Sequence, residues 1–184
     1  MQPTISTDRD FATRGRRFDE QLEGLGKAWA GEPLLDGARS VVPTELRQPV
    51  PLLLGGTADA SIGRVTRFAE GWTAGGLPPD AVAGMVERVQ SAWTEGGRAG
   101  RAKIVALAYY SLGDHEENSR QYLLDYYAAM GGDVAEMISG SALRSAEAIR
   151  GAVDAYAGVG VDELILDPTV ADPAQVDALA EVVF

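Results

Sequence analysis

The chain has 184 residues, which is enough for one domain with a sizeable core, and its 46% hydrophobic content is ordinary for a globular protein. A formal net charge of −11 argues against nucleic acid or an anionic membrane surface as a partner, because an acidic surface repels both. With no cysteine and one histidine, the sequence excludes disulfides, thiolate chemistry and a metal site built from several histidines of one chain. No stretch approaches the ~20 apolar residues of a membrane span, and no apolar signal core opens the chain, so we expect a cytoplasmic protein.

The first half of the chain predicts alternating helices and strands. Apolar side chains at helical spacing indicate a first helix, capped by Asp8 and ending at about Ala30. Residues 32–49 carry three prolines and little periodicity, which is typical of a loop. The elements expected next are a strand over Val50–Leu54, a helix over Ala58–Glu70, a strand over Gly71–Ala74 and a helix from Pro78 to Gly96.

The second half predicts two more strands and several helices. Lys103–Tyr110 is an unbroken apolar run, typical of a strand in a parallel sheet covered on both faces. After it we expect a helix capped by Asp114, a short extra helix over Asp133–Ile138, a helix from Ser141, a strand over Val161–Leu166 and a helix from Pro173. Repeated strand–helix units predict an α/β fold with a parallel sheet and right-handed crossovers, formed by a single domain over residues 1–184.

The most informative motif is the run Gly55, Gly56, Thr57, Ala58 and Asp59, which joins an apolar strand to an amphipathic helix. Two glycines allow a sharp turn and a close approach of the backbone to a ligand. The following helix directs unpaired N–H groups and the positive end of its dipole at the same point. This arrangement predicts an anion site, with phosphate as its natural occupant; a plain tight turn is the alternative.

Several segments of the chain resemble luciferase-like flavin or deazaflavin oxidoreductases. Glu70 stands where that family commonly has aspartate. The segments that carry the resemblance are Arg14–Glu20 with Leu25 and Trp29, Pro51–Gly56, Arg67–Trp72 and Tyr156–Leu166. They correspond to the second half of the family's TIM-type (β/α)8 barrel, so the resemblance implies that fold for this chain.

The resemblance also implies a function and a set of binding residues. A full member would have roughly 100–150 further residues, holding the first four strands, before Met1. FMN or a deazaflavin of the coenzyme F420 type would bind at the carboxyl ends of the strands, where the backbone of Gly55 and Gly56 would hold its phosphate. Thr57, Ala58 and Asp59 would add to this turn. The resemblance assigns no catalytic residue to this chain, and no metal site is expected.

Other positions near the carboxyl ends of the strands are weaker candidates. Gly75 and Gly76 follow a predicted strand and either give room for phosphate or substrate or form a simple loop. Asp167 and Thr169 end the last strand, where barrel enzymes place functional groups. Trp72 is expected in the core rather than in a pocket. Tyr109 and Tyr110 alternate across a strand, so only one of them faces the barrel interior.

Three interpretations of the chain remain open from its sequence. The first is an enzyme in which a reduced flavin or deazaflavin passes hydride to, or activates oxygen at, a small organic substrate. The second is a non-catalytic half-barrel that binds the cofactor or a partner chain. The third is a fragment of a longer enzyme, with Met1 inside a longer reading frame. The open edges of a half-barrel predict pairing, either in a homodimer or with a complementary N-terminal half-barrel chain.

Overall fold

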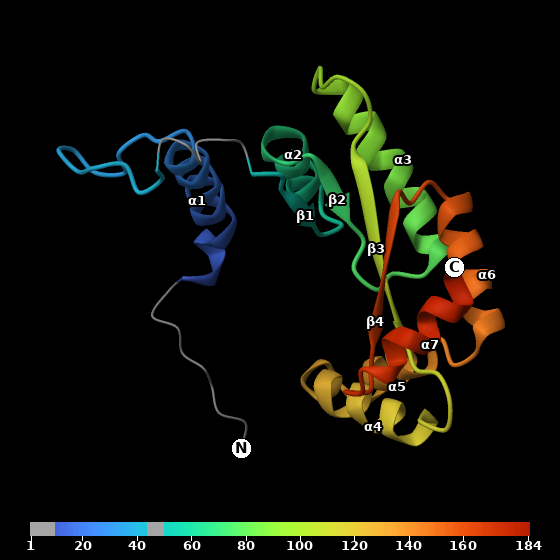
Figure 1. Ribbon diagram of the computed structural model, residues 1–184. Coiled ribbons are helices and arrows are strands. Elements are labelled where there is room, and N and C mark those ends of the chain that lie inside the picture. The colour runs from blue at the N-terminus through green and yellow to red at the C-terminus, as the bar shows by residue number, and fades with distance from the viewer. Residues whose placement is uncertain (1–9, 44–49) are drawn as a thin grey trace.

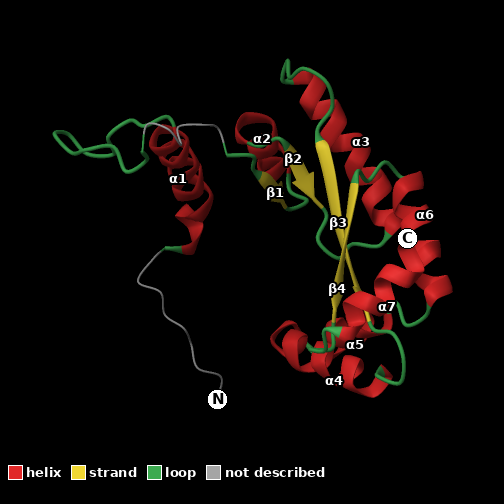
Figure 2. Cartoon of the chain, viewed as in Figure 1, coloured by secondary structure: helices red, strands yellow, loops and turns green. Residues whose placement is uncertain are grey.

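The computed structural model describes residues 10–43 and 50–184, which form an α/β fold around one parallel sheet (Figures 1 and 2). The four strands lie in the order β1-β2-β3-β4, the same as their order in the chain. Their bounds are β1 Leu53–Gly55, β2 Gly71–Thr73, β3 Lys103–Tyr110 and β4 Glu163–Pro168. The sheet is open, so the chain forms part of a barrel and does not close one by itself.

Helices follow every strand and cover one face of the sheet. They are α2 Asp59–Phe68, α3 Pro79–Glu95, α6 Ala146–Gly158 and α7 Ala174–Val183. A further helix, α1 Arg14–Trp29, precedes β1 and follows a 3-10 turn, η1 Phe11–Thr13. Between β3 and α6 the chain makes an excursion through α4 Glu116–Tyr127, η3 Ala128–Met130 and α5 Gly132–Gly140, which lie together beyond the ends of β3 and β4 (Figure 1).

Two predicted helix starts in the second half are wrong. Asp114 does not cap α4, because His115 occupies the cap position and no side chain there accepts a hydrogen bond. Ser141 does not begin a helix but ends α5, and Ser145 caps α6 by accepting a hydrogen bond from the N–H of Ala148. The segment between them passes beside β3, where Leu143 forms an isolated parallel bridge with Tyr110. The expected cap at Asp8 lies outside the described residues.

The main core fills the space between the sheet and its helices. The strand register places Leu54, Trp72, Ile104 and Leu164 on the helix-covered face of the sheet. There they pack with buried residues of α2 and α3, among them Val65, Val82 and Val89. Trp72 is completely buried in this cluster, as its apolar strand position predicts.

The opposite face of the sheet would line the interior of a closed barrel. By the same register it carries Leu53, Thr73, Leu107 and Ile165. The side chains of Leu53 and Ile165 are 39% and 45% exposed, which is unusual for a parallel sheet because such sheets are normally covered on both faces. Part of the barrel interior is therefore open.

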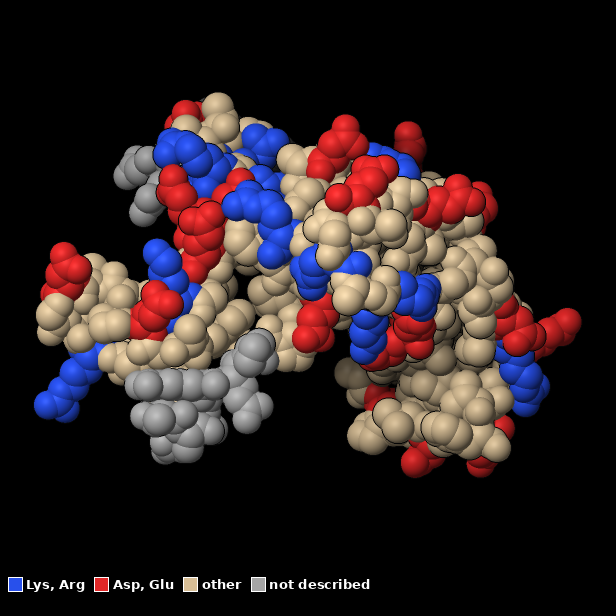
Figure 3. Space-filling model, turned by 90° about the horizontal axis from the view of Figure 1, so that it is seen from above, with Lys and Arg blue, Asp and Glu red and all other residues tan. Residues whose placement is uncertain are grey.

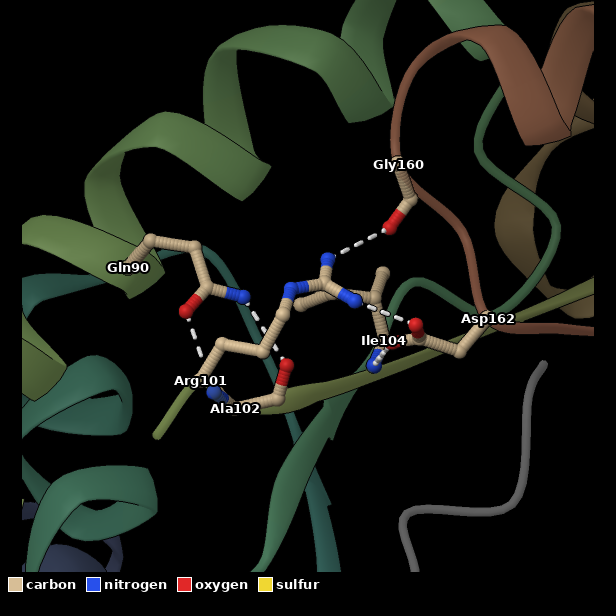
Figure 4. Close-up of polar contacts among 6 residues, drawn as sticks. All are labelled: Gln90, Arg101, Ala102, Ile104, Gly160 and Asp162. Carbon is tan, nitrogen blue, oxygen red and sulfur yellow. Dashed lines mark hydrogen bonds and ion pairs between the residues drawn. The ribbon is translucent and has the colours of Figure 1, made fainter. Parts of the chain in front are cut away.

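The amino ends of β3 and β4 are fastened by polar contacts (Figure 4). The carboxylate of Asp162 accepts hydrogen bonds from the Arg101 guanidinium and from the backbone N–H of Ile104, the latter at 2.7 Å. The side-chain amide of Gln90, on α3, exchanges two hydrogen bonds with the backbone of Ala102. Figure 3 views the molecule from this side and shows Lys and Arg interspersed with Asp and Glu, consistent with ion pairs such as Lys103–Glu163. This end of the sheet is structural.

No helix among the described residues is both long and apolar enough to cross a membrane.

Candidate functional site

The predicted glycine turns lie side by side at the carboxyl edge of the sheet. Gly55 ends β1 and is paired in register with Thr73, which ends β2. The turn from β1 into α2 and the loop from β2 into α3 therefore meet at one place. The structure thus brings Gly55–Asp59 and Gly75–Gly76 together at the edge where α/β proteins bind their ligands.

The turn at Gly56 requires glycine. Its φ angle is +104°, a conformation that other residues rarely adopt, and a Cβ there would lie 2.7 Å from Ser61 Oγ. Gly55 is less constrained, because its added Cβ would lie 3.3 Å from the Thr73 side chain. From the core, the indole N–H of Trp72 donates a 3.0 Å hydrogen bond to the carbonyl of Gly56. The backbone of this turn is therefore held in one conformation.

The amino terminus of α2 opens directly from this turn and presents backbone donors. Ala58 is the cap residue and has an extended backbone, with no side chain that satisfies the helix start. No hydrogen bond links the N–H of Thr57 or Ala58 to any residue in the described part of the chain. Because the helix dipole adds positive potential at the same point, the arrangement suits an anion such as phosphate.

Asp59, the first residue of α2, is paired with a cation at this site. Its side chain is 97% exposed and forms a 2.7 Å ion pair with Arg88 of α3. The same guanidinium donates to the carbonyl of Thr57 at 3.2 Å. Arg88 therefore offsets the carboxylate and braces the turn from outside, so the residues present fit a bound phosphate.

The second predicted glycine pair, Gly75 and Gly76, is only partly free to meet a ligand. The N–H of Gly75 donates to Thr73 Oγ1 at 3.3 Å, and its carbonyl accepts from the N–H of Leu107 at 2.8 Å. Gly75 is thus engaged within the protein at a φ of +57°. Gly76 is exposed beside it, and an added Cβ would meet only the Leu107 carbonyl, at 4.0 Å. This pair mainly shapes the loop and leaves room next to the first turn.

A pair of tyrosines lies at the carboxyl end of β3. Tyr109 faces the barrel interior, beside Asp167 on β4, whereas Tyr110 faces the helices, as strand alternation requires. The hydroxyls of Tyr109 and Tyr127 are 2.7 Å apart. Burial, followed by this hydrogen bond, raises the pKa of Tyr109 above its usual value of 10.0. Tyr109 is therefore a neutral hydrogen-bonding group at neutral pH.

The other polar groups near this end are mostly engaged in the protein. Thr169, a candidate from the sequence, is buried against α4, with its hydroxyl 2.8 Å from Ser119 Oγ and 3.1 Å from the carbonyl of Tyr110. Asp167 remains on the interior face. The buried hydroxyl of Ser111 has no hydrogen-bond partner within the described residues. Those residues also contain no cluster of three or more His, Cys, Asp or Glu side chains suited to a metal ion.

Sequence reasoning missed three side chains that shape the first turn. Thr73 contacts the turn from the interior face, Ser61 lies under Gly56, and Arg88 reaches it from α3. Only Thr73 could have been found from the chain, as the interior-facing last residue of a strand that neighbours the glycine turn. Arg88 and Asp59 are 29 positions apart in the sequence, and no local sequence pattern predicts a contact over that separation.

Comparison with known proteins shows the family of this chain. A family model described as luciferase-like monooxygenase matches residues 2–182. The chain belongs to the luciferase-like monooxygenase family. An uncharacterised protein of Mycobacterium tuberculosis is 37% identical over 76 residues, which are 38% of this chain and 26% of that protein.

Solved structures of similar fold show what this chain covers. An F420-dependent secondary alcohol dehydrogenase, in complex with an F420-acetone adduct, matches 98% of this chain and 64% of its own, with a TM-score of 0.73 and 12% identity. A riboflavin lyase with modified FMN and riboflavin matches 92% of this chain and 56% of its own, with a TM-score of 0.59 and 17% identity. The expected TIM-type fold of this family is confirmed, and the chain spans less than two thirds of these proteins.

Proposed function

We propose that this chain forms part of a flavin- or deazaflavin-dependent oxidoreductase, of the monooxygenase or dehydrogenase type, acting on a small organic substrate. The turn at Gly56 carries the proposal, since its backbone conformation and the open start of α2 form a cradle for a phosphate. Both FMN and coenzyme F420 carry phosphate, and the solved proteins of similar fold include one with each kind of cofactor. When bound, such a cofactor supplies the redox chemistry, namely hydride transfer or oxygen activation.

Each residue of the cradle has a distinct role in this proposal. Gly55 and Gly56 let the backbone approach the phosphate closely. The N–H groups of Thr57 and Ala58 donate to it. Asp59 stays outside, paired with Arg88. These groups bind and orient the cofactor and take no part in its chemistry.

The interior face beside the cradle supplies one wall of the substrate site. Thr73, Tyr109 and Asp167 all point to that side of the sheet near its carboxyl edge. The neutral phenol of Tyr109, hydrogen-bonded to Tyr127, can donate to or accept from a polar group of a substrate. The acidic side chain of Asp167 makes this wall selective against anionic substrates.

A second candidate function is a half-barrel that binds the cofactor or a partner chain without turnover. The open interior face, with Leu53 and Ile165 exposed, favours it, because a water-filled interior does not protect a reduced flavin. The two functions differ in one measurement. In an enzyme, added substrate speeds either oxidation of the reduced cofactor, for a monooxygenase, or reduction of the oxidised cofactor, for a dehydrogenase, whereas a binding module holds the cofactor with no effect of substrate.

The cradle is tested by comparing two ligands that differ only in the phosphate. We expect the chain, in its assembled state, to quench the fluorescence of FMN at lower concentration than that of riboflavin. Gly56→Ala forces a Cβ against Ser61 and strains the backbone, so FMN affinity should fall roughly tenfold, the size of a helix-terminus charge interaction. Riboflavin affinity should not change.

Gly63→Ala is the matched control, because Gly63 lies in α2, the helix that follows the turn, with no atom within 4 Å of its added Cβ. It should bind FMN like the unaltered protein. Equal FMN affinity in the Gly56→Ala and Gly63→Ala proteins would reject the cradle. Repeating the titration with coenzyme F420 tells which cofactor the chain prefers.

A further inference from the structure

Helix α4 lies across the carboxyl ends of β3 and β4 (Figure 1). Its residues Ser119, Leu123 and Tyr127 follow one another at the spacing of one helical turn, so they share one side of the helix. The Ser119 hydroxyl is 2.8 Å from that of Thr169, which directly follows β4. The Tyr127 hydroxyl is 2.7 Å from that of Tyr109 on β3. Helix α4 therefore brings its tyrosines next to the interior face of the sheet.

Three tyrosine rings form an aromatic corner at this place. The ring centroids of Tyr109 and Tyr127 are 6.2 Å apart, with an angle of 68° between the ring planes. Those of Tyr127 and Tyr126 are 4.9 Å apart, with an angle of 80°. Tyr109 and Tyr127 are half-buried, whereas Tyr126 is 65% exposed. The corner is thus partly shielded from water and open to solvent at one end, and its ring faces carry negative potential.

The carboxylate of Asp167 adds a full negative charge beside this corner. Asp167 is paired in register with Tyr109 across neighbouring strands, which lie about 4.8 Å apart, and its side chain is half-buried. Burial is the main cause that raises the pKa of Tyr109, and the charge of Asp167 adds to it, as expected for two groups close together. No ion pair within residues 10–43 and 50–184 includes Asp167.

Basic side chains on the neighbouring elements are bound elsewhere. Lys103, on the same face of β3, lies six residues away, or about 20 Å along the strand, and pairs with Glu163 at 2.6 Å. Arg120 of α4 pairs with Glu136 at 2.6 Å. Arg144, in the segment before α6, donates to two backbone carbonyls, at 2.9 and 3.3 Å. The negative potential of the corner and Asp167 therefore calls for a cation from outside the chain.

We propose that the aromatic corner and Asp167 bind the charged group of a small organic cation, such as an alkylated ammonium, and that the substrate of this site carries such a group. Ring faces attract alkylated ammonium groups, and more strongly where water is partly excluded. A metal ion does not fit, since it needs several oxygen ligands and the described residues hold no acidic cluster. The inference names a substrate class and so rests on the proposed function, but cation binding itself needs no cofactor.

The test compares choline with its neutral isostere dimethylbutanol, in which carbon replaces the charged nitrogen. Proton NMR at constant ionic strength follows the methyl signal of each probe as the protein is titrated. The choline signal should shift upfield and saturate, because ring currents act on groups that lie over ring faces. Its affinity should exceed that of the isostere roughly fivefold, as expected for a cation–π contact. Equal shifts and affinities for the two probes would overturn the proposal.

A parallel titration with FMN separates this inference from the proposed function. FMN binding without choline binding would overturn the cation site and leave the phosphate cradle in place. Choline binding without FMN binding would support the cation site while counting against the redox function.

Two pairs of variants locate the bound cation. Asp167→Asn removes the charge with little change of shape and should lower choline affinity roughly threefold to tenfold, with no effect on dimethylbutanol. Asp154→Asn is the control, because it removes the same charge from an exposed position on α6 and should have no effect. Tyr127→Leu should abolish the upfield shift, whereas Tyr127→Phe, which keeps the ring, should retain it. Equal weakening by the two aspartate variants would show general attraction to an acidic protein and contradict the site.

Discussion

At the scale of single residues, Trp72 links the core to the candidate phosphate site. Its ring is buried among α2 and α3, while its N–H holds the carbonyl of Gly56. Trp72→Phe removes this hydrogen bond and leaves a small cavity, so the free energy of unfolding should fall by about 1–3 kcal/mol. FMN affinity should fall as well, because the turn loses its support. Urea unfolding and FMN titration measure the two effects.

Trp93→Phe is the control for this prediction. Trp93 is also buried, and its N–H also donates to a backbone carbonyl, that of Ala99 at 3.2 Å, but on the amino-end side of the sheet. The two variants should lose similar stability, and only Trp72→Phe should lose FMN affinity. If both lower FMN affinity equally, Trp72 acts only through general stability.

At the scale of elements, the sequence predicted strands and turns better than helix faces. The bounds of β3, Lys103–Tyr110, were predicted to the residue, because an apolar run bounded by polar residues indicates where a strand begins and ends. The glycine turn was recognisable because its backbone conformation needs glycine. The hydrogen bond that Arg88 donates to this turn was not recognisable, because Arg88 lies on another helix, far away in the sequence.

Helical spacing in the sequence predicts apolar stripes of Tyr122, Leu123, Tyr126, Tyr127 and Met130 on α4 and η3 and of Val176, Leu179, Ala180 and Val183 on α7, but only Leu123 among them is buried. On α4, Leu123 is buried as the stripe predicts, whereas Tyr122 and Tyr126 are exposed. On α7 the expected Val176 is 60% exposed, whereas its neighbour Gln175 is buried. Amphipathic spacing does not determine the rotation of a helix about its own axis to better than one residue. In α7 this rotation is set by the hydrogen bonds of Gln175 rather than by apolar burial.

The side chain of Gln175 links α7 to the loop after β3 through two hydrogen bonds. Its side-chain amide accepts from the N–H of Leu112 at 2.8 Å and donates to the Leu112 carbonyl at 2.9 Å. Gln175→Leu leaves both backbone groups without a partner, so unfolding free energy should fall by about 2–4 kcal/mol. Hydrogen exchange at the Leu112 amide should also speed up.

The control for Gln175 is Gln121→Leu on the exposed side of α4, where the amide donates to Asp125 and has no other hydrogen bond within the described part of the chain. It should change unfolding free energy by less than about 0.5 kcal/mol, as usual for a surface position. Unchanged exchange at Leu112 in the Gln175→Leu protein would show that the loop is held by other contacts.

At the scale of the whole molecule, the recognisable family and the open sheet have the same cause, which is that the chain corresponds to half of a barrel. The sequence determined the fold because its motifs occur in the order of half a barrel, and the structure shows that half with its outer helices in place. The exposure of Leu53 and Ile165 follows from that arrangement rather than from a defect of packing. Whether the chain is one domain by itself remains a prediction.

The molecule should also lose stability at alkaline pH. Burial raises the pKa of Tyr110 and Tyr156 above 10.0, as it does for Tyr109, and the hydrogen bond to Glu163 raises that of Lys103. The folded state therefore keeps these protons at pH values where the unfolded chain releases them. The unfolded state then binds fewer protons, so the free energy of unfolding declines as pH rises through and above the pKa of free tyrosine.

Urea unfolding at a series of pH values, followed together with phenolate absorbance, measures this loss. Part of the phenolate signal should appear only as the protein unfolds. Tyr156→Phe removes one buried phenol and its 2.8 Å hydrogen bond to the Leu77 carbonyl, so this variant should be less stable at neutral pH yet less sensitive to alkali. An unchanged pH dependence in the variant, with phenolate formed before unfolding, would refute burial as the cause.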